Sequence, residues 1–235
     1  MNEERTFPAI LSRTSGRSLR RQVATIAVLL LCPLLTYAAF VMSRAYRAAP
    51  RFVASAERSG RLALRLDDFP AGFLEALVTV EDPRFYRHPG IDPITPGAGF
   101  TTITQSVVKQ LYFDGVRSRF LGTLKEGLIA LSFDARVSKR EQLRVFVSMV
   151  YLGAPAGRPL HGFHEGARGY FGKDLKALTR PEFLALVAAI VDPNELDPAR
   201  HDGENAARVR RIEKLLRGEC RPIASWDIYY RGCGS

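Results

Sequence analysis

Residues 179–193, TRPEFLALVAAIVDP, give the clearest indication of the fold class. Thr179 and Glu182 have the spacing of a capping box, so a helix is predicted to begin there. Residues 183–191 are apolar at every position, and Pro193 ends the run. A helix without a polar face is normally buried inside its domain. We therefore predict that this helix is the central element of a helical domain.

The same helical periodicity extends outward from this stretch, and strand-like alternation is scarce from Pro70 onward. Further helices are expected at about residues 70–80, from Thr101 or Thr102 to 112, at 121–135, after a capping box of Ser138 with Glu141, and at 204–217, with Gly218 as a C-cap. The predicted fold class is mainly α.

The length and composition are those of a chain with one hydrophobic core, and the net positive charge indicates an anionic binding partner. The chain has 235 residues, a net charge of +10 and a pI of about 9.9. Nucleic acid, phospholipid headgroups and pyrophosphates all attract such a protein. No nucleic-acid-binding module is recognisable in the sequence, so nucleic acid is not expected as a partner.

Residues 23–42, VATIAVLLLCPLLTYAAFVM, carry no charge. A helix of that length covers about 30 Å, the thickness of the bilayer's hydrocarbon core. A cleaved signal peptide has a shorter apolar region and a small-residue cleavage site, so an uncleaved single-pass anchor is favoured. Arginines both precede and follow the span, and the positive-inside rule therefore gives no orientation.

These features predict five segments along the chain. They are a basic tail at 1–22, a transmembrane anchor at 23–42, a linker at 43–60, the helical domain at 61–218 and a C-terminal tail at 219–235. Cys32 lies in the span. Cys220 and Cys233 either pair in an oxidising compartment or remain free thiols.

Glu81 ends an apolar helix stripe that contains Leu74, Leu77 and Val78. It has no basic residue three or four positions before it, so partial withdrawal from water should raise its pKa. That is the tuning a general base or acid needs near neutral pH. The structural alternative is a helix-end carboxylate that is hydrogen-bonded to nearby backbone N–H groups.

Glu126 is in a similar position. Ile129, Ala130 and Phe133 follow it at helical spacing, and no lysine or arginine lies at salt-bridge spacing along its helix. Two such glutamates are a candidate couple for glycosyl chemistry, although the spacing does not show that they converge.

Other polar residues are interpreted as structural. A lone loop histidine such as His88 is typically a hydrogen-bonding group. Metal ligation by His161 and His164 is not favoured, because Pro159 and Gly162 argue against a helix that aligns them. The arginines at 208, 210 and 211 are interpreted as a solvated helix face.

Five ordered blocks across residues 60–217 resemble the signatures of the peptidoglycan glycosyltransferases. These are the transglycosylase domains of class A penicillin-binding proteins and the monofunctional transglycosylases. EDPRFYRHPGID (81–92) resembles the first signature and GFTTITQSVVKQLYF (99–113) the second. Residues 124–153 are similar to the third and fourth, and residues 165–193 resemble the fifth.

The resemblance implies a lysozyme-like helical domain outside the bacterial inner membrane, which leaves the basic tail at 1–22 in the cytoplasm. The implied reaction polymerises lipid II into glycan strands and releases undecaprenyl pyrophosphate. By position, Glu81 would remove the proton of the attacking sugar hydroxyl. Glu126 would help to position the departing pyrophosphate, or to neutralise it through a divalent cation such as Mg²⁺. The implied substrate-binding residues are Asp82, Phe85, His88, Thr102, Gln105 and Lys109. The implied partners are lipid II, nascent glycan, membrane lipid and peptidoglycan synthases.

The sequence also departs from the family pattern. Gly122 and Thr123 replace an Arg-Lys pair before the second glutamate, and Ser148 stands where asparagine is usual. Loss of these cations leaves open a non-catalytic scaffold that binds lipid II or synthases. A lysozyme-like hydrolase also uses two carboxylates, but the membrane anchor and the signatures make it the weaker alternative.

Overall fold

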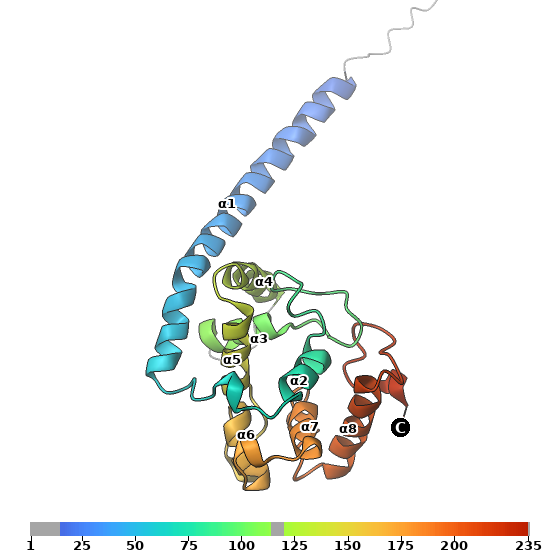
Figure 1. Cartoon of the computed structure of the whole chain (residues 1–235). Coiled ribbons are helices and arrows are strands. Elements are labelled where there is room, and N and C mark those ends of the chain that lie inside the picture. Colours follow the sequence, from blue (N-terminus) through green and yellow to red (C-terminus); the bar gives the residue numbers. More distant parts are fainter. Residues whose placement is uncertain (1–14, 114–119, 235) are drawn as a thin grey trace, which may run out of the picture. The chain divides into compact units, whose positions relative to one another are not determined.

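The computed structural model describes the backbone of residues 15–113 and 120–234, and their side chains except at 15–18, 120 and 121. Its contacts divide the chain into two compact units, one through Phe40 and the other from Val41 onward. A single helix, α1 (Ser15–Arg58), contributes to both units (Figure 1).

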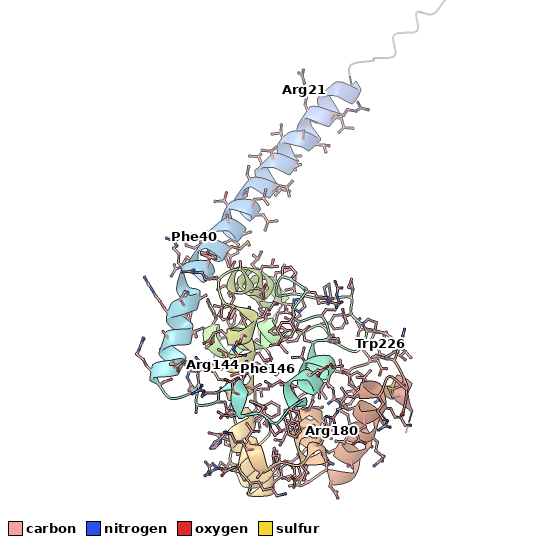
Figure 2. All side chains as sticks on the ribbon, in the orientation of Figure 1. Arg21, Phe40, Arg144, Phe146, Arg180 and Trp226 are labelled. Atoms are coloured by element: carbon pink, nitrogen blue, oxygen red, sulfur yellow. A yellow bond between two sulfur atoms is a disulfide. The ribbon has the colours of Figure 1, made fainter. Side chains whose placement is uncertain are left out.

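In the first unit, the apolar side chains of α1 are exposed (Figure 2). Examples are Leu29, Leu30 and Leu35. The part of this helix at Leu19–Arg58 contains a window with a mean hydropathy of 2.2 that is only 6% buried. By length and composition, this helix is able to cross a membrane.

In the second unit, α1 continues through the segment expected to be a linker at 43–60. Ala45, Ala49 and Ala56 are buried there. The Tyr112 hydroxyl donates to the Ala45 carbonyl at 3.0 Å, and Arg144 forms an ion pair with Glu57. Small alanines on one helix face allow close packing, so residues 43–58 form a packed helix and not a linker.

The remaining helices confirm a mainly α fold. They are α2 (Phe73–Glu81), α3 (Ile103–Tyr112), α4 (Phe120–Asp134), α5 (Lys139–Met149), α6 (Gly162–Phe171), α7 (Arg180–Ala189) and α8 (Asp202–Leu216). Short 3-10 turns lie at Leu66–Asp68, Pro155–Gly157, Leu175–Ala177 and Arg231–Cys233. The described residues contain no β-sheet, only an isolated bridge between Tyr151 and His161.

Local capping explains where several helices begin. Thr102 and Thr179 each form a complete capping box, with Gln105 and Glu182 respectively. Ser138 accepts a hydrogen bond from the Glu141 amide at the start of α5. The capping box predicted at Thr179 and the cap predicted at Thr102 are therefore confirmed. Of the box predicted for Ser138 with Glu141, the structure shows the hydrogen bond to the Ser138 side chain.

The central position predicted for α7 is confirmed. The side chains of Phe183, Leu184, Leu186 and Val187 are fully buried. Helix α7 packs against α2, α6 and α8, and α3 packs against α4 and α5 (Figure 1). This arrangement fixes α2, which carries Glu81, next to α7 and α8.

The C-terminal segment beyond α8 is more ordered than the expected tail at 219–235. Cys220 and Cys233 form a disulfide with a Cα–Cα distance of 5.2 Å. Tyr230 is only 1% exposed and donates its hydroxyl hydrogen to the Val80 carbonyl. The segment is thus attached directly to the helix that ends at Glu81.

Candidate active site

Glu81 is the last residue of α2 and lies at the wall of a cavity of about 470 Å³. The cavity is also lined by Lys109 of α3 and Arg208 of α8. Side chains from three helices that are distant in sequence therefore surround one space. It contains a carboxylate and two cationic groups.

The half-buried position of Glu81 raises its pKa from 4.5 to about 7. Burial is the main cause because it disfavours the charged form, and Asp82 adds a smaller repulsion. Arg208 acts in the opposite direction, but no ion pair joins the two side chains among the described residues. Near neutral pH, Glu81 can therefore both accept and release a proton.

Arg208 is buried, at 2% exposed, so its interpretation as part of a solvated face is wrong. Its guanidinium donates to the carbonyls of Val187, Ala188 and Ile228 at 2.8–3.3 Å. Within the described part of the chain, its buried Nε has no hydrogen-bond partner. Helical periodicity could not identify this arginine as a site residue, because its carbonyl acceptors lie on α7 and in the C-terminal segment.

Lys109 connects the cavity to the second predicted glutamate. Its Nζ lies 3.5 Å from Glu126 Oε1 and 3.2 Å from the Thr101 hydroxyl. Burial raises the pKa of Glu126, which is 4% exposed, and Lys109 partly offsets that rise. Among the described residues, Glu126 pairs with this lysine of α3 and with no basic residue of its own helix, so its interpretation as an unpaired carboxylate is wrong.

Asp82 and His88 form a buried network directly after Glu81. The Gly90 amide donates to His88 Nδ1 at 3.0 Å, so we assign the ring proton to Nε2. Nε2 then donates to both Asp82 oxygens at 2.9 Å, and the Ile103 amide donates to Asp82 Oδ2 at 3.0 Å. The network ties the end of α2 to the start of α3.

Thr102 and Gln105 extend this connection. The Thr102 hydroxyl donates to the Gly90 carbonyl at 2.7 Å, and Gln105 Oε1 accepts from the Thr102 amide at 3.1 Å. Gly90 has a φ of +101°, and a Cβ there would lie 2.6 Å from the Ala130 carbonyl of α4. Only glycine fits, and the loop therefore packs directly on the helix that carries Glu126.

Phe85 lies in the core at 0% exposed, with Lys139 Nζ 4.6 Å from its ring centroid. Lys109 is thus the one predicted substrate-binding residue that lines the Glu81 cavity. The other five are buried and do not line this cavity, so substrate contact by them stays a prediction; they are Asp82, Phe85, His88, Thr102 and Gln105.

A second cavity, of about 440 Å³, contains His161 and His164. Helix α6 begins at Gly162, directly after His161, and His164 lies in its first turn. Gly162 therefore does not prevent a helix at this position. Ser148 lines the same cavity, and its buried hydroxyl has no hydrogen-bond partner among the described residues. No group of three or more potential metal ligands gathers in the described part of the chain.

Comparison with known proteins identifies the family. The transglycosylase family model matches residues 50–217. The chain is 32% identical to penicillin-binding protein 1B of Vibrio cholerae over 186 residues, which is 72% of this chain and 24% of that protein. It is 29% identical to penicillin-binding protein 1B of Haemophilus influenzae over 199 residues, covering 78% of this chain and 25% of that protein.

Penicillin-binding protein 1F of Bacillus subtilis is 30% identical over 169 residues, 66% of this chain and 23% of that protein. The chain therefore spans about a quarter of the length of these relatives. The match runs from the second half of α1 to the end of α8 and includes both glutamates. The chain belongs to the peptidoglycan transglycosylase family.

Proposed function

We propose that this protein is a membrane-anchored glycosyltransferase that polymerises lipid II and releases undecaprenyl pyrophosphate. The observation that carries the proposal is the Glu81 carboxylate at the wall of the cavity that also holds Lys109 and Arg208. A base with a pKa of about 7 is suited to accept a hydroxyl proton near neutral pH.

In the proposed reaction, the 4-hydroxyl of one lipid II sugar attacks the anomeric carbon of the growing chain. Its proton moves to Glu81 as the new C–O bond forms. The bond from the anomeric carbon to the pyrophosphate oxygen breaks, and the pyrophosphate leaves with the electron pair. Glu81 then returns the proton to solvent.

The leaving group gains negative charge, which a preorganised cation stabilises in a partly dry site. Lys109 is positioned for this role, because Glu126 and the Thr101 hydroxyl hold its ammonium group. Arg208 adds positive charge at the same cavity. Lys109 and Arg208 are the side chains that supply positive charge in the proposed step.

We further propose that α1 anchors the protein in the inner membrane with the domain on the extracytoplasmic side. The apolar window of the helix supports the anchor. The Cys220–Cys233 disulfide supports the orientation, because disulfides persist in oxidising compartments.

A non-catalytic scaffold that binds lipid II or a peptidoglycan synthase is the second candidate. It is favoured by Gly122 and Thr123, which leave α4 without the two cations expected before Glu126. Lys109 and Arg208 favour the catalytic candidate, since they place positive charge near Glu81 by another route.

Incubation of the full chain in detergent with lipid II separates these candidates. Catalysis predicts glycan strands from the native protein and a large loss of product with Glu81→Gln. Glu75→Gln is the matched control, because Glu75 is an exposed residue of the same helix. Lipid II binding without polymerisation, unchanged by Glu81→Gln, would select the scaffold.

A further inference from the structure

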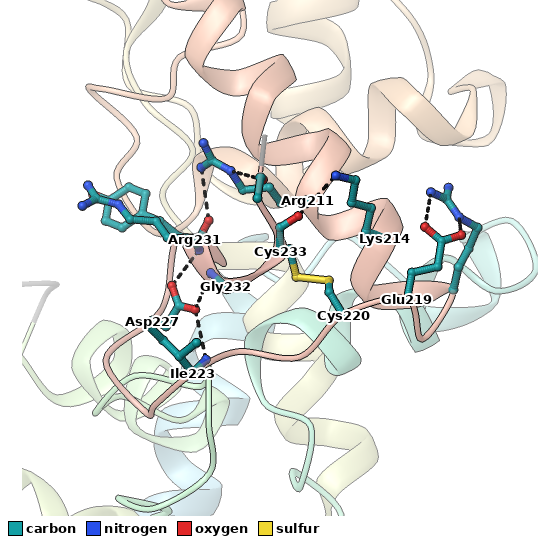
Figure 3. The surroundings of a disulfide bond; sticks show 12 residues. Arg211, Lys214, Glu219, Cys220, Ile223, Asp227, Arg231, Gly232 and Cys233 are labelled. Carbon is teal, nitrogen blue, oxygen red and sulfur yellow. Dashed lines mark hydrogen bonds and ion pairs between the residues drawn. A yellow bond between two sulfur atoms is a disulfide. The ribbon is translucent and has the colours of Figure 1, made fainter.

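The C-terminal segment from Cys220 to Cys233 lies outside the family match, yet it is folded as a closed loop (Figure 3). The disulfide joins its ends. Inside the loop, the Asp227 carboxylate accepts hydrogen bonds from the amides of Ile223, Arg231 and Gly232 at 2.7–3.2 Å. We call residues 220–233 the disulfide loop.

The disulfide loop is attached to the helices of the active site. Arg211 and Lys214 of α8 donate to backbone carbonyls in or next to it at 3.1–3.3 Å (Figure 3). Arg208 donates to the Ile228 carbonyl at 2.8 Å, and Tyr230 donates to Val80, the residue before Glu81. The position of the loop is therefore fixed relative to Glu81.

The loop also pairs with the backbone that follows the first signature. The amides of Gly97 and Gly99 donate to the carbonyls of Ala224 and Ser225 at 2.9 and 2.8 Å. A Cβ at Gly97 would lie 2.5 Å from Pro222 and 2.7 Å from Tyr230. This close approach makes the disulfide loop and the 97–100 segment adjacent walls of the Glu81 cavity.

These two walls bring aromatic rings to the cavity. Trp226 (labelled in Figure 2) is 61% exposed, Phe100 is 69% exposed, and both line the cavity. Thr101, Ser106 and Glu81 line the same space. An aromatic face packs against the C–H face of a sugar ring, while hydroxyl and carboxylate groups hydrogen-bond with its hydroxyls.

We propose that the disulfide loop is a saccharide-binding wall of the active site, and that Trp226 packs against a sugar ring of the glycan substrate. The inference rests on the proposed function for the identity of the sugar. It deepens that function by assigning substrate recognition to a segment outside the family match.

A tryptophan ring also suits a membrane interface, so lipid is the competing ligand. The cavity that Trp226 lines contains a carboxylate, Lys109 and Arg208. Those groups match the hydroxyls and phosphates of a lipid-linked sugar better than hydrocarbon. The experiment therefore includes lipid without sugar.

The fluorescence of Trp226 tests the proposal directly, because it is the single tryptophan of the chain. The full chain carrying Glu81→Gln, in detergent, is titrated with lipid II, with lipid-free glycan strands, with undecaprenyl pyrophosphate and with sugar-free anionic vesicles. We expect a saturable change with the two sugar-containing ligands. A change with vesicles or undecaprenyl pyrophosphate equal to that with lipid II, or no change at saturating radiolabelled lipid II, would overturn the proposal.

Substitutions in the disulfide loop distinguish a loss of ring packing against the sugar from a loss of the folded loop. Trp226→Ala should raise the Kd for radiolabelled lipid II about tenfold, and Trp226→Phe should retain most of the affinity. Ile223→Ala is the matched control, because Ile223 is 65% exposed in the same loop but does not line the cavity. Equal affinities of the Trp226→Ala and Ile223→Ala proteins for lipid II would contradict the proposal that Trp226 packs against a sugar ring.

The two proposals fail in different ways. A saturable fluorescence change without polymerisation by the native protein would support the saccharide wall and refute catalysis. Polymerisation with a KM for lipid II that is unchanged in Trp226→Ala would support catalysis and refute saccharide binding by the disulfide loop.

Discussion

Glu81 and Glu126 are two glutamates of one domain in different electrostatic surroundings. Glu81 lines the cavity and has no ion-pair partner among the described residues. Glu126 lies 3.5 Å from Lys109, whose charge offsets part of the effect of burial. The pKa of Glu81 rises to about 7.

The difference assigns the two carboxylates to different tasks. A carboxyl group that gains and loses a proton near neutral pH can act as a base. Glu126 is instead paired with Lys109, whose charge opposes the effect of burial on its pKa, and the pair fixes the position of the ammonium group. Glu81 is thus suited to proton transfer, and Glu126 to orientation of the cation that faces the leaving group.

The largest expected effect is on the polymerisation rate, and it distinguishes the roles of the two glutamates. Glu81→Gln should lower the polymerisation rate about 1,000-fold, because the proton acceptor is lost. Glu126→Gln should lower it about tenfold to 100-fold, because Lys109 remains but is less well oriented. Initial rates with labelled lipid II measure both, and equal losses would show that the comparison is wrong.

Substitution of Lys109 tests the other member of its ion pair with Glu126. Lys109→Met should lower the rate on the order of 100-fold, because a cation near the departing pyrophosphate is lost. It should also raise the pKa of Glu126 further, since the offsetting charge disappears. Lys125→Met, at an exposed position next to Glu126, is the control and should leave the rate near that of the native protein.

A smaller effect concerns stability and depends on pH. The folded pKa of Glu81 is above its ordinary value of 4.5, so the contribution of Glu81 to the stability of the native protein falls as pH rises from about 4.5 through about 7. Glu81→Gln should therefore be more stable than the native protein at about pH 8, by about 3 kcal/mol, and equal to it below about pH 4.5. Thermal unfolding at both pH values measures this difference, and a pH-independent difference would contradict the raised pKa.

The helices were largely predictable because their signals are local. Thr102, Ser138 and Thr179 mark the starts of three helices through hydrogen bonds to residues three positions away. The apolar run of α7 specifies its buried position without reference to any other element. The raised pKa of Glu81 was also expected, since its helix offers an apolar stripe and no basic neighbour.

Features that depend on distant partners were missed. Arg208 looks like a solvated arginine along α8, but its acceptors lie on α7 and in the disulfide loop. The pairing of Glu126 with Lys109 crosses between two helices and has no spacing signal. Alanines at 45, 49 and 56 permit the close packing that makes the expected linker part of a helix.

The dependence of kcat/KM on pH for lipid II polymerisation by the native protein is the most direct test of Glu81 as the base. With Glu81 as the base, kcat/KM should rise about tenfold per pH unit below about pH 7 and become constant above it. A kcat/KM that is constant from about pH 5 to about pH 8 would contradict it, because an ordinary glutamate with a pKa near 4.5 would give that profile.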